Sequence, residues 1–287
     1  MTHPIDAPAD LPAQQQEWPG SDAELTPPAD HGARSWVGRD RLRGKRAVVT
    51  GGDSGIGRAV AVAFAREGAD LMIAHLPQEE DDAAKTVSLV GDSARVVRHP
   101  SDLRTAAANR ELAERAVDEL GGVDVLVCNA AFQMAHDELA EFPPEQLERT
   151  FATNVLGPFW LIQALAPQLR DGGCVIVTTS VQAYAPSDHL LDYAATKAAL
   201  NNLVVNLAQE LGPQGTRVNA VAPGPIWTPL IPATMGPEQV EGFGADTPLG
   251  RPGQPVEVAA AYVFLASDEA SYVSGTVLGV TGGKPVF

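Results

Sequence analysis

The sequence contains little cysteine and little positive charge. Its two cysteines, Cys128 and Cys174, both lie inside apolar runs of a 287-residue chain. We therefore expect buried free thiols rather than a disulfide framework. Twenty basic residues stand against 36 acidic ones, for a net charge of −16. Because binding to nucleic acid needs a basic surface, we expect no nucleic-acid partner.

Long hydrophobic runs are missing as well. No segment reaches the roughly 18 consecutive apolar residues of a membrane span, and the N-terminus lacks the basic-then-apolar pattern of a signal peptide. These absences predict a soluble cytoplasmic protein without a membrane partner. What is present is an ordinary globular composition, 45% hydrophobic and 20% charged, which is enough for a large core.

Residues 1–44 differ in composition from the rest of the chain. They contain six prolines and no helical or strand period. Proline removes backbone donors that regular elements need, so the segment is either an extended arm or a disordered tail. Trp18 and Trp36 favour an arm that docks on the rest. We predict a proline-rich N-terminal arm over 1–44 and a single domain over 45–287.

From residue 45 onward, short β-branched runs alternate with longer stretches rich in alanine and leucine. The expected strands cover 46–50, 70–75, 94–99, 124–129, 174–179, 217–221 and 276–280, and the expected helices include 56–67, 104–120, 145–169 and 191–211. Continuous apolar strands indicate a parallel sheet that is buried on both faces. The alternation predicts an α/β protein with a doubly wound parallel sheet of about seven strands, a Rossmann fold.

A glycine-rich turn, "TGGDSGIGRA", follows the first expected strand. Gly51, Gly55 and Gly57 lie between that strand and the helix expected next. A pyrophosphate approaches a backbone closely only where side chains are absent, and the N–H groups of a starting helix stabilise its charge. The alternative is a tight turn that needs glycine for conformation alone. The position between strand and helix favours a nucleotide site.

The spacing T-G-x-x-x-G-x-G resembles that of the short-chain dehydrogenase/reductase family, and the resemblance covers about residues 40–287. It extends to "CNAA", where Asn129 and Ala130 match the family's N-N-A-G while Cys128 and Ala131 depart from it. The resemblance implies that a nicotinamide cofactor is held by Gly51, Asp53, Ser54, Gly55, Ile56, Gly57, His75, Asp102, Leu103, Asn129, Ala130, Tyr193, Lys197, Pro223, Gly224, Ile226 and Thr228. For Asp102 the alternative is an N-cap of the helix expected at 104–120.

The end of the second expected strand bears on the choice between NAD and NADP. An acidic residue at that point binds the ribose 2′-hydroxyl, whereas arginine accommodates a 2′-phosphate. The stretch "AHLPQEEDD" has neither at the strand end, but its acidic run repels phosphate. Ser54 also occupies a position where NADP-dependent members often carry a basic residue. We favour NAD; NADP stays open because a protonated His75 would bind a phosphate.

Three further residues predict proton-transfer chemistry. Tyr193 and Lys197 are four positions apart, so a helix places them on one face. An ammonium beside a phenol lowers its pKa from ~10 towards the range where acid–base catalysis is efficient. The alternative is a core tyrosine and a solvated lysine. Ser180 ends the fifth expected strand, at the sheet edge where open α/β sheets bind ligands.

In the resembled family, a serine, a tyrosine and a lysine at the same spacings form the active site. The family's active-site asparagine corresponds to Asn154. The resemblance implies that Ser180 and Tyr193 bind a carbonyl, that Tyr193 transfers the proton, and that Asn154 positions a water. We therefore predict an NAD(P)-dependent oxidoreductase that acts on an alcohol, aldehyde, ketone or sugar. A catalytically silent NAD(P)-sensing regulator and an epimerase or dehydratase that uses NAD transiently are the alternatives.

The remaining expectations concern the substrate pocket and the assembly. Candidates for the pocket are Gln182, Tyr184, His189 and Trp227, with 225–250 as a mobile lid and no metal site. The proline-rich extension together with "GGDSGIGRA", "SVQAY" and "APGPIWTPL" resembles the bacterial general-stress subgroup of the family. Family members commonly form homotetramers through the helices expected at 145–169 and 191–211 and the C-terminal strand, and the same is expected here.

Overall fold

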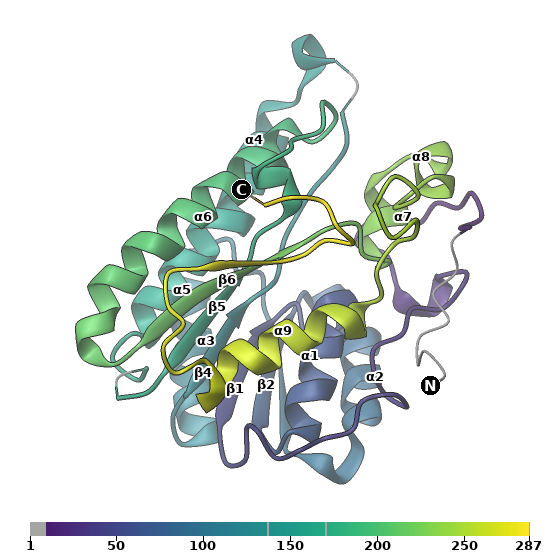
Figure 1. Ribbon diagram of the computed structural model, residues 1–287. Helices are drawn as coiled ribbons and strands as arrows, with labels where there is room; N and C mark the ends of the chain where they lie inside the picture. Colours follow the sequence, from purple (N-terminus) through teal and green to yellow (C-terminus); the bar gives the residue numbers. More distant parts are fainter. Residues whose placement is uncertain (1–9, 137, 170, 287) are drawn as a thin grey trace.

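The computed structural model describes residues 10–136, 138–169 and 171–286. Within them, seven parallel strands form one sheet in the order β3-β2-β1-β4-β5-β6-β7 (Figure 1). The strands are β1 (Arg46–Thr50), β2 (Asp70–His75), β3 (Val96–Pro100), β4 (Val125–Cys128), β5 (Cys174–Thr178), β6 (Arg217–Pro223) and β7 (Val277–Val280). The predicted doubly wound parallel sheet is confirmed.

Helices cover both faces of the sheet because each strand is apolar on both sides. In β1, Val49 packs into the core cluster beneath one layer of helices and Val48 into the cluster beneath the other. The first layer contains α1 (Gly55–Arg66), α2 (Glu80–Val90) and α9 (Pro255–Ala266). The second contains α3 (Ala106–Leu120), α5 (Gly157–Leu165) and α6 (Leu191–Leu211).

Two of the sequence predictions for helices need correction. The helix expected over 145–169 is divided into α4 (Pro144–Phe151), a π-helical turn η5 (Ala152–Leu156) and α5. The helix expected from residue 104 begins at Ala106, and its N-cap is Thr105, whose hydroxyl accepts the Ala108 N–H at 3.2 Å. The N-cap alternative for Asp102 is therefore wrong, since that carboxylate binds Arg104 instead.

The remaining elements are short. Two helices, α7 (Leu230–Thr234) and α8 (Pro237–Glu241), lie in the segment expected to be a lid. The 3-10 turns are η1 (Asp22–Glu24), η2 (Pro77–Glu79), η3 (Gly91–Ser93), η4 (Leu139–Glu141), η6 (Val181–Ala183), η7 (Gly212–Gln214) and η8 (Asp268–Ala270). Both cysteines are free and buried, as expected. In the described part of the chain, no helix is long and apolar enough to cross a membrane.

The described part of the N-terminal arm, residues 10–44, is docked on the domain. Leu11 and Leu25 are buried in a cluster with Trp227. At the other end of the arm, Trp36 donates its Nε1–H to Glu67 at 3.0 Å. Burial opposes ionisation of Glu67, but bonds from Arg41 and other arm groups outweigh it and lower the pKa of Glu67 to about 2. The arm is thus held by both apolar and charged contacts, while the boundary at 44/45 stays a prediction.

Candidate active site

A cavity of about 910 Å³ lies at the carboxyl ends of the strands, and most of the predicted site residues line it. On the nucleotide side these are Gly51, Asp53, Ser54, Gly55, Ile56, His75, Asp102, Leu103, Asn129, Ala130, Pro223, Gly224, Ile226 and Thr228. Ser180, Tyr193 and Lys197 line the same cavity. Gly57 and Asn154 are not among its lining residues. The meeting of these groups follows from the parallel sheet, which places all strand ends at one edge.

The glycine turn needs glycine both for its backbone conformation and for close packing against neighbouring protein atoms. Gly51 and Gly55 have φ values of +64° and +48°, which disfavour a side chain. A Cβ on Gly51 would lie 3.1 Å from Ala130 Cα, and one on Gly57 only 1.8 Å from the Gly51 carbonyl oxygen. Gly57 therefore permits packing within the turn rather than lining the cavity. The Gly55 N–H at the start of α1 donates to Asp22, and the N–H groups that directly follow it have no intrahelical acceptors, which is the arrangement that binds a pyrophosphate.

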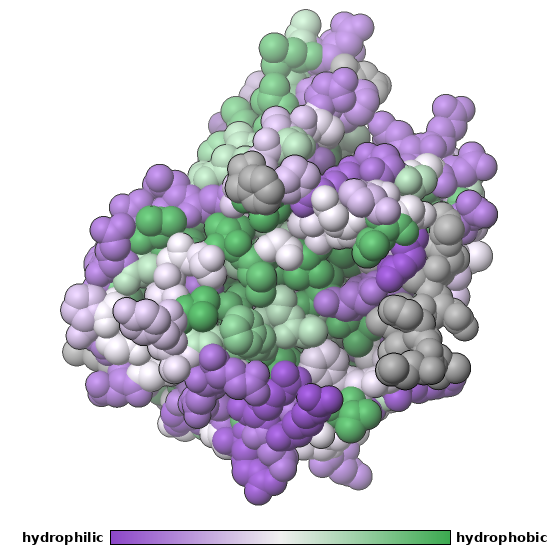
Figure 2. All heavy atoms as spheres, in the orientation of Figure 1, coloured by the Kyte–Doolittle hydropathy of each residue, from purple (hydrophilic) through white to green (hydrophobic). Residues whose placement is uncertain are grey.

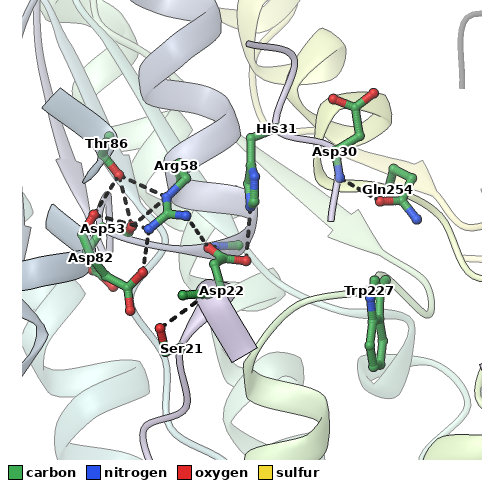
Figure 3. A network of polar contacts seen from close by, with 12 residues as sticks. Ser21, Asp22, Asp30, His31, Asp53, Arg58, Asp82, Thr86, Trp227 and Gln254 are labelled. Atoms are coloured by element: carbon green, nitrogen blue, oxygen red, sulfur yellow. Dashed lines mark hydrogen bonds and ion pairs between the residues drawn. The ribbon is translucent and has the colours of Figure 1, made fainter. Parts of the chain in front are cut away.

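A buried arginine behind the turn holds it in shape, and the sequence did not reveal it. Arg58 Nε donates to the Asp53 carbonyl at 2.8 Å, and its guanidinium forms ion pairs with Asp82 at 2.6 Å and Asp22 at 3.0 Å (Figure 3). Asp22 also accepts the Gly55 N–H at 2.9 Å. Asp22 comes from the arm, so no local sequence pattern connects it with the turn.

Ser180, Tyr193 and Lys197 come from the end of β5 and from α6. Lys197 Nζ lies 5.2 Å from the centroid of the Tyr193 ring and donates to the Thr178 carbonyl at 2.8 Å. Burial raises the pKa of Tyr193 to about 12, against a smaller lowering by a hydrogen bond with Ser180. Burial also lowers the pKa of Lys197 to about 7. The three groups form a desolvated cluster beside the glycine turn.

These pKa values differ from the expectation that Lys197 lowers the pKa of Tyr193. The reason is desolvation, which disfavours both the phenolate and the ammonium. With a pKa near 7, Lys197 is only partly charged at neutral pH, so it exerts little electrostatic pull on the phenol. The sequence reveals the spacing of the pair but not the extent of its burial.

Asn154 lies behind the cavity wall, in the π-helical turn η5. Its amide N donates to the Phe132 carbonyl at 2.8 Å and to the Thr196 hydroxyl at 3.1 Å, and its Oδ1 accepts the Phe132 N–H at 2.7 Å. Single π-helical turns often occur at functional sites. In this structure the asparagine ties α4–α5 to the segment after β4, and its predicted role with a water stays a prediction.

The structure places one residue of the acidic run, Glu79, next to the end of β2, a position that the sequence did not reveal. His75 is buried, and its ring contacts the Leu76 carbonyl at 2.9 Å. Glu79 lines the cavity four residues further on and accepts the Leu76 N–H at 2.9 Å. Burial and then the charge of Asp53 raise the pKa of Glu79 to about 8. The turn η2 thus folds Glu79 back into a position next to the strand end.

The substrate side of the cavity combines predicted and unpredicted residues. Gln182 and His189 line it, whereas Tyr184 and Trp227 are not among its lining residues. Trp227 is fully buried and donates its Nε1–H to the Pro27 carbonyl of the arm at 2.8 Å. Further lining residues include Trp18, Pro19, Phe132, Gln133 and Arg149. Two of these come from the arm, which the sequence did not connect with the cavity.

Known proteins resemble the chain over most of its length. A family model described as enoyl-(acyl carrier protein) reductase matches residues 51–284, from the glycine turn almost to the C-terminus. The chain belongs to the short-chain dehydrogenase/reductase family. General stress protein 39 of Bacillus subtilis is 46% identical over 278 residues, covering 96% of this chain and 97% of its own length.

Two further proteins also resemble the chain over most of its length. Glucose and ribitol dehydrogenase of Daucus carota is 40% identical over 281 residues, covering 96% of this chain and 97% of its own. The crystal structure of a short-chain dehydrogenase from Burkholderia cenocepacia in complex with NADP has a TM-score of 0.80 at 33% identity, covering 85% of this chain and 99% of its own. The predicted family and its stress-protein relatives are confirmed, and the enzyme class is an oxidoreductase of the dehydrogenase/reductase type.

Proposed function

We propose that the protein is an NAD(H)-dependent oxidoreductase that interconverts a hydroxyl and a carbonyl group on a small substrate. One observation carries the proposal: Ser180, Tyr193 and Lys197 line the same cavity as the glycine turn. A proton donor, a hydrogen-bond donor for a carbonyl and a nucleotide site are therefore within reach of one bound substrate. The carrot relative's name adds a sugar or sugar alcohol to the substrate classes to be tested.

The residues of this chain supply the proton and hold the substrate in position. In reduction, Tyr193 donates its phenolic proton to the substrate carbonyl oxygen while Ser180 donates a hydrogen bond to the same oxygen. In oxidation, the Tyr193 phenolate takes the proton back from the hydroxyl. After reduction, Lys197, partly protonated near pH 7, returns a proton to the phenolate, and its ammonium would hold the ribose of a bound nucleotide. When bound, a nicotinamide supplies or accepts the hydride.

NAD is the preferred cofactor in this proposal, and NADP is the alternative. Asp53 and Glu79 line the cavity beside the end of β2, and burial raises the pKa of Asp53 to about 6 and that of Glu79 to about 8. A carboxyl group at this point accepts a hydrogen bond from a ribose 2′-hydroxyl. A 2′-phosphate would meet the negative charge of the buried Asp53 there. The NADP complex of the Burkholderia structure is the reason to test both cofactors.

The test is turnover of NADH, NADPH and their oxidised forms against a panel of ketones, aldehydes, sugars and sugar alcohols. Replacing Tyr193 with Phe removes the proton donor, and we expect kcat to fall about a thousandfold with NADH binding retained. Tyr272→Phe, at a fully exposed tyrosine, is the matched control and keeps full activity. Turnover that survives Tyr193→Phe contradicts the mechanism, and cofactor binding without turnover of any substrate favours the sensor.

A further inference from the structure

Residues 18–22 of the arm are attached to two walls of the cavity, the glycine turn and the segment after β4. Trp18 and Pro19 line the cavity together with residues of the glycine turn and of the segment after β4. Asp22 is bound to the first of these walls and Trp18 to the second. The segment between them therefore links the two walls of the crevice in which the nucleotide is proposed to lie.

The attachment at Asp22 is buried and charged (Figure 3). Its carboxylate accepts the Gly55 N–H and contacts Arg58 and His31 at 3.0 and 3.1 Å, and its side chain is 2% exposed. Burial opposes ionisation of this carboxyl, but the His31 bond, Arg58 and the Gly55 amide outweigh it, so the pKa of Asp22 is below its ordinary value. Releasing this end would leave a desolvated guanidinium without one of its partners.

The attachment at Trp18 is weaker and lies at the edge of the cavity. The Trp18 ring packs edge-on against Phe132, with centroids 5.8 Å apart and planes at 70°. The guanidinium carbon of Arg149 lies 4.0 Å from the Trp18 ring centroid and 4.1 Å from that of Phe132. Arg149 is half-buried. Contacts of this kind are modest in energy and break without stranding a buried charge.

The rest of the arm is held independently of Trp18. Trp227 donates its ring N–H to the Pro27 carbonyl, the Val256 N–H is bonded to the Asp30 carbonyl at 3.0 Å, and Trp36 is bonded to Glu67. Loss of the Trp18 contact therefore frees the segment over the cavity without detaching the arm.

We infer that residues 18–22 are a strap across the nucleotide crevice, with Asp22 as its fixed end and Trp18 as the end that releases when a nucleotide enters or leaves. The inference rests on the proposed nicotinamide-nucleotide function of the cavity. Because the Trp18 ring must leave Phe132 and Arg149 before the strap lifts, the contact limits both the association and the dissociation of the nucleotide. Trp18 is a positioning residue for the cofactor site, not a catalytic one.

The experiment measures both rate constants for NADH by stopped-flow fluorescence, with binding in one direction and displacement by excess ADP-ribose in the other. Trp18→Ala should raise both rates about tenfold, so that Kd changes less than either rate. Arg149→Met, which keeps the tryptophan and removes the cation, should change both rates in the same direction. Trp36→Ala, at an arm tryptophan bonded to Glu67 outside the cavity, should leave both rates unchanged.

The outcomes separate the strap from the proposed function. Unchanged association and dissociation rates in Trp18→Ala and Arg149→Met, with melting temperatures near that of the wild type, would overturn the strap proposal. NADH binding by the same variants would still support the proposed function. Faster dissociation with unchanged association would also overturn the strap proposal, because Trp18 would then be a simple contact of the bound nucleotide. A wild type that binds neither NADH nor NADPH would overturn both proposals.

Discussion

Burial acts in opposite directions on the two ionisable groups of the proposed proton-transfer pair. It raises the pKa of Tyr193 to about 12 and lowers that of Lys197 to about 7. Both shifts disfavour the charged form, so near pH 7 Tyr193 is neutral and Lys197 is only partly charged. A neutral phenol is the form that donates a proton to a carbonyl, which suits the proposed reduction.

The burial of Lys197 predicts a stability effect with a defined sign. Its pKa is about 7 in the folded protein and ~10.4 in a free lysine. Between these values the unfolded chain holds the proton more tightly, so stability rises with pH in that window. Below pH 7 the full free-energy cost of burying the Lys197 ammonium is present. We expect Lys197→Met to be about 2 kcal/mol more stable than the wild type at pH 7, with the difference shrinking towards pH 10.

Urea unfolding at pH 6, 8 and 9.5 measures this difference. Lys85→Met, at an exposed lysine on α2, is the matched control and should leave stability within ~0.5 kcal/mol at each pH. A Lys197→Met variant that is less stable than the wild type at pH 7 would show instead that the bond from Nζ to the Thr178 carbonyl outweighs desolvation.

At the scale of elements, the turn η2 brings Glu79 to the end of β2. Its side chain accepts the Leu76 N–H, which fixes the carboxyl group next to the strand end. We expect Glu79→Arg to raise the ratio of kcat/KM for NADPH to that for NADH at least tenfold, because a guanidinium binds a 2′-phosphate and cannot accept from a 2′-hydroxyl. Steady-state kinetics with both cofactors measures the ratio.

The nearby Asp81 offers a control on the same stretch. Its side chain is exposed on α2, and it is not among the residues lining the cavity. Asp81→Arg should leave the cofactor ratio nearly unchanged. A wild type that prefers NADPH would contradict the proposal that NAD is the preferred cofactor. A cofactor ratio that Glu79→Arg leaves unchanged would contradict it as well.

At the scale of the whole molecule, the exposed apolar surface supports the proposed homotetramer. Figure 2 shows apolar side chains gathered in the middle of the face over β7 and α9. All four residues of β7 are only half-buried. On the helices proposed for assembly, Leu147, Leu156, Phe159 and Val205 are each 41–43% exposed. Apolar patches of this kind are typical of surfaces between subunits.

We expect light scattering to give four times the chain mass of 30.1 kDa. Phe159→Glu should shift the particle to a smaller species, because a charge cannot be buried in an apolar interface without a partner. Val37→Glu, at an arm residue that is 75% exposed, should leave the mass unchanged. A monomeric wild type at micromolar concentration would contradict the assembly.

The sequence alone determined the features that depend on neighbouring residues. The apolar runs of β1 and β2 and the long helix α6 have the predicted bounds, because their patterns and end signals are local. The glycine turn and the Ser180, Tyr193 and Lys197 spacing were visible for the same reason. The break at η5 was not, since a π-helical turn changes the hydrogen-bond register without a strong sequence signal.

Only the tertiary structure decided what depends on residues far apart in the chain. Asp22 contacts Gly55 and Arg58, which are more than 30 positions away in the chain. Trp18 contacts Arg149, which is more than 130 positions away. The burial that sets the pKa values of Tyr193 and Lys197 is equally non-local, because it comes from every element packed around α6. Local pattern specifies elements and motifs, whereas the desolvation and long-range contacts that tune a site arise only when the chain is packed.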